Sequence, residues 1–279
     1  MRSLNNPIAV LFVTALIAAC SCTKRPNDEK KLEIQNPTSY LLRKIIWSGP
    51  TSNGESLAFF YNSDHLVSKI ERYEWSGGPS QITYDTSYYS FEYTNGLCTK
   101  WKVSEGFEGY FIFEYNNRNL PVKRTCYYAD NSFSHATFYK YDNDDNLIEK
   151  TDSAVTIDFR SVYAYDSNND LVSSIEYILW SSPQQKVKYE WSNFDQKVNF
   201  IKAVNGLPVT AAYDNNVGSY SSSSPNNAQT ENYFSQVDIN QSFGSPNSSS
   251  FSYEYNEQGL PVKMKTGPWI VTFEYEKYK

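Results

Sequence analysis

A unit of about twelve residues recurs seven times along the chain, and this repeat constrains the fold more than any other feature. Each copy has two or three aromatic residues at alternate positions, a short turn rich in Asn and Asp, then Leu, another apolar residue and usually Lys or Arg. The copies span 59–70, 91–101, 113–124, 139–150, 163–174, 189–200 and 253–264. The chain ends on the first half of a unit alone, at 273–279.

One unit predicts a β-hairpin. In the strand at 111–115, Phe111, Phe113 and Tyr115 share one face because side chains alternate across a strand. Residues 116–119 have turn chemistry, since Asn tolerates left-handed backbone and its side chain bonds the nearby main chain. The strand that follows alternates in the same way, so each hairpin has a mainly apolar face and a polar face.

Hairpins repeated along the chain predict an all-β protein, built as an antiparallel meander of roughly 16–18 strands. We expect these strands to form a large barrel, a half-barrel or a coiled sheet. Residues 40–47 resemble the second half of a unit, and 273–279 are a first half, so the two ends are expected to pair. Such closure would remove exposed sheet edges, which invite aggregation.

A single repetitive β domain is expected over residues 39–279, with a loop-rich insertion at 214–250. The insertion is rich in Ser, Asn and Pro, and such stretches have little to bury. In chain order we expect a further hairpin, a loop, a strand and a second loop, at 197–213, 214–230, 233–239 and 240–250.

The first 19 residues predict a lipoprotein signal peptide. Arg2 gives a positive start, and Ile8–Ala19 is an apolar run of signal-peptide length, too short to span a bilayer as a helix. The run ends in Leu-Ile-Ala-Ala-Cys, which resembles the bacterial lipobox, where cleavage falls just before a cysteine that is then acylated. We therefore expect palmitate-type acyl chains on Cys20, followed by a flexible tether over residues 20–38.

Two alternatives remain for this segment: an ordinary secretory signal with a chance cysteine, or acylation at Cys22, whose upstream residues match the lipobox less well. Acylation would tether the protein to a membrane outside the cytoplasm. Asp28 and Glu29 resemble the acidic tags of some surface lipoproteins, although solvated charge in a linker explains them equally well. We expect a lipid-anchored outer-membrane protein that faces the periplasm or the cell surface.

A membrane-spanning barrel is the competing interpretation of the same strands. Its lipid-facing positions would have to be apolar over about 25 Å. Here Arg124 and Lys150 interrupt the apolar face. The opposite face carries charges in most units, at Glu92, Glu114, Lys140, Glu190 and Glu254. The pattern therefore favours a barrel that is not embedded in lipid.

The charged residues exclude one class of partner. The 31 acidic and 25 basic residues give a net charge of −6, and the Lys and Arg are scattered singly along the strands. A nucleic-acid surface requires basic residues clustered on one face. No nucleic-acid partner is therefore expected, and we expect a monomer.

Two units resemble the tyrosine-aspartate (YD, or RHS-type) repeats of secreted wrapping proteins, through Tyr139-Lys140-Tyr141-Asp142 and Tyr163-Ala164-Tyr165-Asp166. Those repeats place Gly in the turn, which only Gly96 and Gly259 do here. Combined with the lipobox, residues 40–279 look more like a group of bacterial lipoproteins of unknown function with a porin-like β-fold. The resemblance implies a soluble or surface-attached β-structure and supplies no catalytic residues.

No catalytic, cofactor or metal site is expected. Neither His65 nor His135 belongs to a zinc-protease pair, and the β domain has no nucleophile elbow, glycine-rich phosphate loop or Cys-x-x-Cys pair. The run 142–146 mimics the start of a calcium loop, but Leu147 stands where that loop has Gly and Ser153 where it has Glu. A polar turn is the better interpretation of this run.

The six tryptophans are the candidate ligand-binding residues, and they fall near expected strand ends. Their rings could stack on sugars or line the mouth of a barrel. The simpler interpretation is that they fill the interior of the sheet. They are Trp47, Trp75, Trp101, Trp180, Trp191 and Trp269.

These features predict a non-enzymatic, lipid-anchored envelope protein. Its apolar strand faces favour a hydrophobic or lipid-like ligand held inside a barrel or cup. The tryptophans and the Ser/Asn-rich loops favour an alternative, in which the rim binds a glycan or another surface protein. A third interpretation is a structural spacer or an accessory subunit of a surface complex.

Cys98 and Cys126 are the cysteines of the β domain. They lie one and six residues after the turn leucines of their units, which places them on opposite sheet faces if neither strand bulges. We expect two free, partly buried thiols, although an oxidising compartment would permit a disulfide.

Overall fold

The computed structural model describes residues 39–50, 53–76, 83–104, 108–153, 157–207 and 224–278. The expected signal peptide at 1–19, Cys20 with the rest of the tether, and most of the first expected loop lie outside these residues. Pro37–Lys279 form one compact unit. Among the described residues this unit contains 17 strands and one short 3-10 helix.

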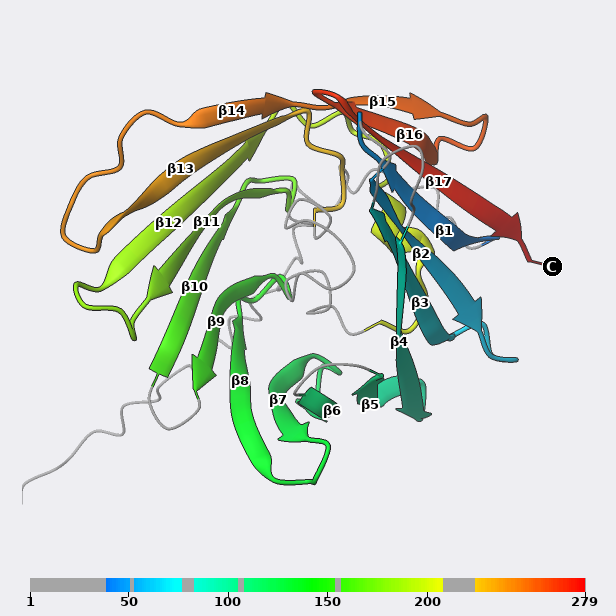
Figure 1. The fold of residues 1–279 in the computed structure, drawn as a ribbon, viewed down its shortest axis with the longest axis horizontal. Coiled ribbons are helices and arrows are strands. Elements are labelled where there is room, and N and C mark those ends of the chain that lie inside the picture. The colour runs from blue at the N-terminus through cyan, green and yellow to red at the C-terminus, as the bar shows by residue number, and fades with distance from the viewer. Residues whose placement is uncertain are drawn as a thin grey trace, which may run out of the picture. The chain divides into compact units, whose positions relative to one another are not determined.

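The elements follow one another around a ring (Figure 1). They are β1 (Tyr40–Ser48), β2 (Gly54–Tyr61), β3 (Val67–Ser76), β4 (Thr83–Thr94), β5 (Leu97–Val103), β6 (Glu108–Tyr115), β7 (Pro121–Tyr128), β8 (Phe133–Tyr141), β9 (Leu147–Ser153), β10 (Ile157–Tyr165), β11 (Leu171–Ile178), β12 (Gln185–Ser192), η2 (Phe200–Ala203), β13 (Thr230–Asp238), β14 (Asn247–Ser250), β15 (Ser252–Tyr255), β16 (Pro261–Thr266) and β17 (Trp269–Lys277). No helix in this part of the chain is long and apolar enough to cross a membrane.

The sheet is an antiparallel meander that forms a nearly closed barrel. From β1 to β14 each strand pairs with the next, and β15 to β17 continue the series. β17 then pairs with β1, from Tyr40 opposite Lys277 to Ser48 opposite Ile270. The predicted pairing of the two ends is therefore confirmed, and the architecture is the barrel among the three that the repeat allowed.

One seam leaves the barrel unsealed. β14 pairs with β13 and β15 pairs with β16, and among the described residues no ladder joins β14 to β15. The prediction of a loop over 240–250 is wrong at β14. All four residues of that strand are exposed, so no apolar alternation marks it, and backbone pairing with β13 holds it in place. The strand expected near 233–239 is confirmed as β13.

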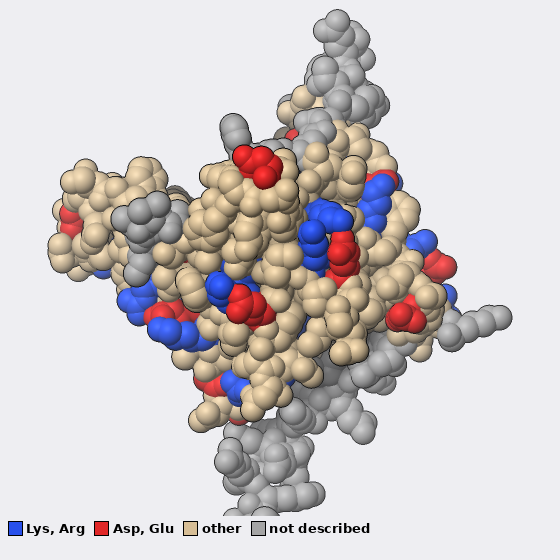
Figure 2. Space-filling model, turned by 90° about the horizontal axis from the view of Figure 1, so that it is seen from below, with Lys and Arg blue, Asp and Glu red and all other residues tan. Residues whose placement is uncertain are grey.

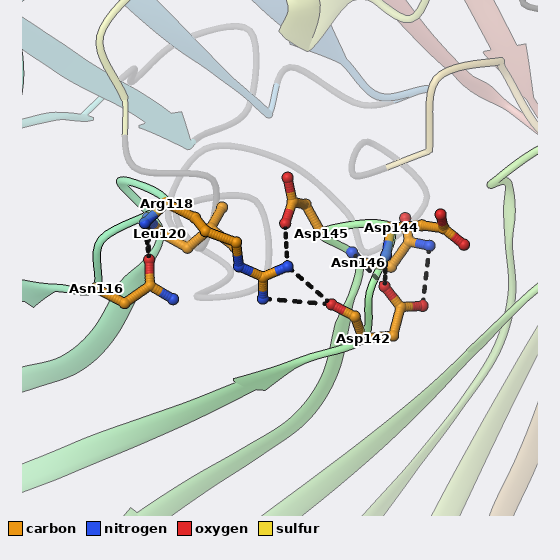
Figure 3. Close-up of polar contacts among 7 residues, drawn as sticks. All are labelled: Asn116, Arg118, Leu120, Asp142, Asp144, Asp145 and Asn146. Atoms are coloured by element: carbon orange, nitrogen blue, oxygen red, sulfur yellow. Dashed lines mark hydrogen bonds and ion pairs between the residues drawn. The ribbon is translucent and has the colours of Figure 1, made fainter. Parts of the chain in front are cut away.

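The first Asn or Asp of each long turn holds that turn together. After β8, the Asp142 carboxylate accepts the backbone N–H groups of Asp144 and Asn146, both at 2.9 Å (Figure 3). Asp145 has a left-handed backbone, with φ of 66°. In four other turns the backbone N–H groups two and four residues later donate to the side-chain oxygen in the same way. These side chains are Asn62, Asn116, Asp166 and Asn256. The run 142–146 is thus a polar turn, as predicted.

These five turns lie at one end of the barrel, here called the Asx end, and the opposite end is called the return end. At the Asx end, six strands each carry a tyrosine whose hydroxyl donates to a carbonyl of a neighbouring strand. The bonds run from Tyr61 to Leu42, Tyr93 to Val67, Tyr115 to Cys98, Tyr141 to Pro121, Tyr165 to Leu147 and Tyr275 to Pro261, at 2.6–2.9 Å. Arg118 adds a tie to the next turn, since its guanidinium lies 2.6 Å from Asp145 (Figure 3).

One inward position of the repeat differs around the barrel. In six of the units an inward residue lies three places after the first residue of the second strand, or four places in β5. It is apolar in β3, β5 and β16 but polar in β7, β9 and β11. The six residues are Ile70, Trp101 and Met264, and then Arg124, Lys150 and Ser174. We call β16, β17 and β1–β6 the apolar half of the wall and β7–β11 the polar half.

The apolar half is filled by the chain itself. Phe200 stacks on Phe273 with ring centroids 4.8 Å apart, and Ala203 and Val204 lie in the same core as Ile70 and Trp101. The prediction of a further hairpin over 197–213 is therefore wrong at η2. The Asn199 side chain accepts the N–H of Ile201, which starts a helical turn, and the apolar residues then pack inward instead of forming a strand.

Cys98 and Cys126 are both buried, and no disulfide joins them. The prediction of opposite faces is wrong, because Cys98 and Cys126 lie in one apolar core. The condition that neither strand bulges fails at Tyr93, opposite Cys98, where the register of β4 and β5 shifts. Burial raises the pKa of Cys98 to about 12, so this thiol is not a reactive one.

The outer face of the wall carries cross-strand ion pairs. Lys123 lies 2.7 Å from Glu114, and Lys263 lies 3.2 Å from Glu254. Lys140 and Arg160 both contact Glu149. Figure 2 shows basic and acidic side chains next to one another at several places on one face of the molecule.

Candidate functional site: the return end of the barrel

The Asx end is bridged by the chain between β12 and β13. The N–H of Val67 on β3 donates to the Asn205 carbonyl at 2.9 Å. On β11 the N–H of Leu171 donates to the Ser224 hydroxyl at 2.8 Å. Because this end already holds protein, the return end is the better place to look for a ligand site.

Four of the six tryptophans lie at the return end: Trp47, Trp75, Trp180 and Trp269. The other two are core residues. Trp101 is fully buried among Tyr89, Phe91 and Phe111 in the apolar half, and Trp191 is buried beside β13, where its indole N–H donates to Glu231 at 2.9 Å. For these two the structure favours the interior role over ligand contact.

Two of the tryptophans lie against glycines. A Cβ added to Gly49 would be 2.8 Å from the Trp269 ring, so that ring rests directly on the backbone, and 42% of Trp269 is exposed. A Cβ added to Gly54 would be 2.1 Å from the Trp75 ring. Trp75 comes five residues after the inward Ile70, so alternation places it on the outer face.

Charged side chains lie beside Trp47 on the inner face. Trp47 is opposite Glu55 in the β1–β2 ladder, and Glu55 is opposite Glu74 in the β2–β3 ladder. The Arg72 guanidinium lies 2.8 Å from Glu55 and also pairs with Glu74. The hydrogen bond that Arg72 donates to the Glu55 carboxylate raises the pKa of Arg72. Sequence reasoning missed this group. Alternation from Ile70 could have placed Arg72 and Glu74 on the inner face, but not opposite Glu55.

A second charged group lies on the inside of the polar half. Arg124 donates to the Thr137 hydroxyl at 3.1 Å, and Thr137 donates to Asp152 at 2.5 Å. Lys150 lies 3.7 Å from Asp152. Burial raises the pKa of the neighbouring Glu176, with Lys150 acting in the opposite direction. The two cations of this group, Arg124 and Lys150, are balanced by the carboxyl groups of Asp152 and Glu176. Such a balance is typical of a network that stabilises the fold.

A third polar group fixes residues 224–228. Asn226 donates to Asp170 at 2.9 Å, and the Tyr255 hydroxyl donates to Asp195. The Asn227 amide lies 3.3 Å from two carbonyls of the chain before η2. Burial raises the pKa of both Asp170 and Asp195. Within the described ranges, no three His, Cys, Asp or Glu side chains are grouped to hold a metal ion.

Comparison with known proteins gives a fold and no family. No protein-family model matches the chain, and no curated protein matches it. A porin-like protein from Bacteroides uniformis ATCC 8492 has a similar structure, with a TM-score of 0.59 and 10% sequence identity over 84% of this chain and 98% of that one. The complex TcdB2-TccC3 without its hypervariable C-terminal region aligns with a TM-score of 0.20 and 12% identity, over 78% of this chain and 11% of that one. The first likeness shows a shared porin-like fold, and the second is too low to show one.

Proposed function

We propose that this chain is a non-enzymatic, lipid-anchored protein of the bacterial cell envelope, whose barrel lies beside the membrane and binds a ligand at its return end. The lipobox at Cys20 supports the anchor. The porin-like fold shared with a Bacteroides protein supports an association with the envelope.

The outward ion pairs carry the proposal. Lys123 with Glu114, Lys140 with Glu149 and Lys263 with Glu254 occupy the same cross-strand position in three of the hairpins. In a bilayer such charges would face hydrocarbon at a cost of about 2–4 kcal/mol for each Lys or Arg near the midplane. In water these charges remain solvated at no such cost. The charged outer wall therefore favours a barrel that lies in water and is not embedded in the bilayer.

The filled interior favours ligand binding at the return end over the hydrophobic cup. Phe200, Ala203 and Val204 already cover apolar surface that a lipid-like ligand would need. In the polar half, paired charges occupy part of the interior, and the apolar residues Leu147 and Leu171 are already covered by Ala228 and Trp191. The return end, by contrast, presents an exposed ring at Trp269 and exposed charges on Arg72 and Glu74.

Labelling with an alkyne analogue of palmitate tests the anchor. In a Gram-negative host, the full chain and a Cys22→Ala variant should incorporate the label and remain in the membrane fraction. A Cys20→Ala variant should lose the label and leave the membrane without detergent, because its barrel does not hold it there. Label retained in Cys20→Ala, or an unlabelled Cys20→Ala variant that still requires detergent, would contradict the proposal.

A further inference from the structure

The inner surface at the return end of β17, β1, β2 and β3 combines an aromatic ring with hydrogen-bonding charges. We call it the aromatic mouth, and it consists of Trp269, Trp47, Glu55, Arg72 and Glu74. The four strands pair in this order. Three gaps between neighbouring strands, each of about 4.8 Å, give the mouth a width of roughly 14 Å.

The charges in the mouth are only partly balanced, since one cation faces two carboxylates. Glu55 and Glu74 are directly opposite each other, and like charges in that relation are destabilising. One guanidinium, that of Arg72, contacts both carboxylates. The group therefore keeps a net negative charge and spare acceptor capacity, with about a third to a half of each side chain exposed.

The ring is presented without a side chain beneath it. Because Gly49 has no Cβ, the benzo ring of Trp269 rests against the strand and the ring remains partly exposed. A flat apolar face next to exposed carboxylates and a guanidinium suits a ligand that has both C–H faces and hydroxyls. Pyranose sugars have this chemistry, since one ring face packs on an aromatic ring while the hydroxyls donate to carboxylates and accept from guanidinium.

We propose that the aromatic mouth binds a neutral pyranose oligosaccharide, with Trp269 as the stacking platform and Glu55, Arg72 and Glu74 as hydroxyl partners. The mouth width of roughly 14 Å, set by the strand spacing, corresponds to two or three sugar rings of about 5 Å each. The excess carboxylate disfavours sulfated or uronic-acid saccharides. This proposal deepens the proposed function and rests on it for the location of the binding site.

Titration with neutral trisaccharides of glucose, mannose, galactose and N-acetylglucosamine tests the proposal. The Cys20→Ala full chain is used in solution, and binding is followed by calorimetry and tryptophan fluorescence. At least one trisaccharide should bind, and Trp269→Ala should weaken it at least tenfold, with partial rescue in Trp269→Tyr. Gly49→Val, which displaces the ring, and Glu55→Gln should also weaken binding.

Trp180→Ala is the matched control, because Trp180 is exposed at the same end but on the β11–β12 connection. It should bind as the parent does. Unchanged melting temperatures would show that each variant is folded. No binding to any of the four trisaccharides, equal binding by Trp269→Ala, or a preference for acidic saccharides would overturn the proposal. The labelling of Cys20 is independent of this result, so failure of the anchor and failure of the sugar site are distinguishable.

Discussion

The two halves of the barrel wall solve the same packing problem with different chemistry. In the apolar half, Ile70 and Trp101 occupy the inward position and are fully buried. In the polar half, Arg124 and Lys150 occupy the equivalent position and are almost as buried. A repeat can therefore keep its backbone and its turns while this inward position changes from an apolar residue to a member of a network of paired charges.

This difference has an energetic consequence. Burial of apolar surface stabilises the fold by about 25 cal/mol for each Å². Buried ion pairs contribute less, because desolvation of the charges offsets much of their attraction. We therefore expect the apolar half to hold the barrel closed and the polar half to be the less stable part of the wall.

The largest expected effect comes from moving a charge between the halves. Ile70→Lys places in the apolar core a lysine, the residue that β9 has at the equivalent position (Lys150). The new lysine has no acidic partner among the core residues around it. It should lower the free energy of unfolding by about 4 kcal/mol or more, measured by urea denaturation. The matched change Lys150→Met should cost about 2 kcal/mol, because Asp152 retains its bond from Thr137.

Equal losses for these two variants would remove the distinction between the halves. If Ile70→Lys does not fold, Ile70→Ser provides the measurement. It copies the Ser174 of β11 and should cost about 3 kcal/mol through lost burial and an unfilled cavity.

The next largest effect tests the filling of the apolar half. Phe200→Ala removes the ring that stacks on Phe273 and should cost about 2–3 kcal/mol in the same urea assay. Phe138→Ala is the control, because Phe138 lies on the outer face with 44% of its surface exposed. Its loss should be below about 0.5 kcal/mol. A neutral Phe200→Ala variant would mean that the segment is not part of the core.

A smaller effect of opposite sign is expected in the polar half. Burial raises the pKa of Glu176 above its ordinary value of 4.5, so folding favours the protonated carboxyl. The stability of the parent should therefore fall as the pH rises from the ordinary pKa through the raised one. Glu176→Gln lacks this ionisation and should melt at a higher temperature at pH 8, with the difference vanishing below the ordinary pKa. A Gln variant that is less stable at pH 8 would show that the electrostatic attraction between Glu176 and Lys150 outweighs the cost of burial.

The smallest effect belongs to the outer face, where both halves are alike. Lys123→Ala breaks the exposed pair with Glu114 and should cost about 0.5 kcal/mol or less at low salt. The difference from the parent should shrink further in 1 M salt, because exposed charges are screened. A loss above about 2 kcal/mol would show that the wall depends on these pairs.

The repeat made the hairpins, the polar turns and the pairing of the two ends predictable, because each depends on neighbours in the sequence. Alternation places Phe111 and Phe113 inward and Glu114 outward, and split half-units at 40–47 and 273–279 imply closure. β14 was missed because a strand with four exposed residues has no apolar pattern. η2 was missed because its residues pack against strands far away in the sequence, notably at Phe273.

The candidate site was predictable only in part. Tryptophans at strand ends are visible in the sequence, and Trp269 lies in the aromatic mouth. The burial of Trp101 and Trp191 depends on which face each strand turns inward, which register shifts alter. The group of Arg72 with Glu55 and Glu74 depends on the register between β2 and β3, which local sequence does not specify.

Hydrogen exchange of the intact protein, read by mass spectrometry at neutral pH, tests the contrast between the halves most directly. The backbone amides of β3, β5 and β17 should exchange only on global unfolding, because they line the apolar half. The amides of β9 and β11 should exchange sooner, and those of β14 and β15 at the seam first of all. Equal protection around the whole barrel, or a polar half that outlasts the apolar half, would contradict this account.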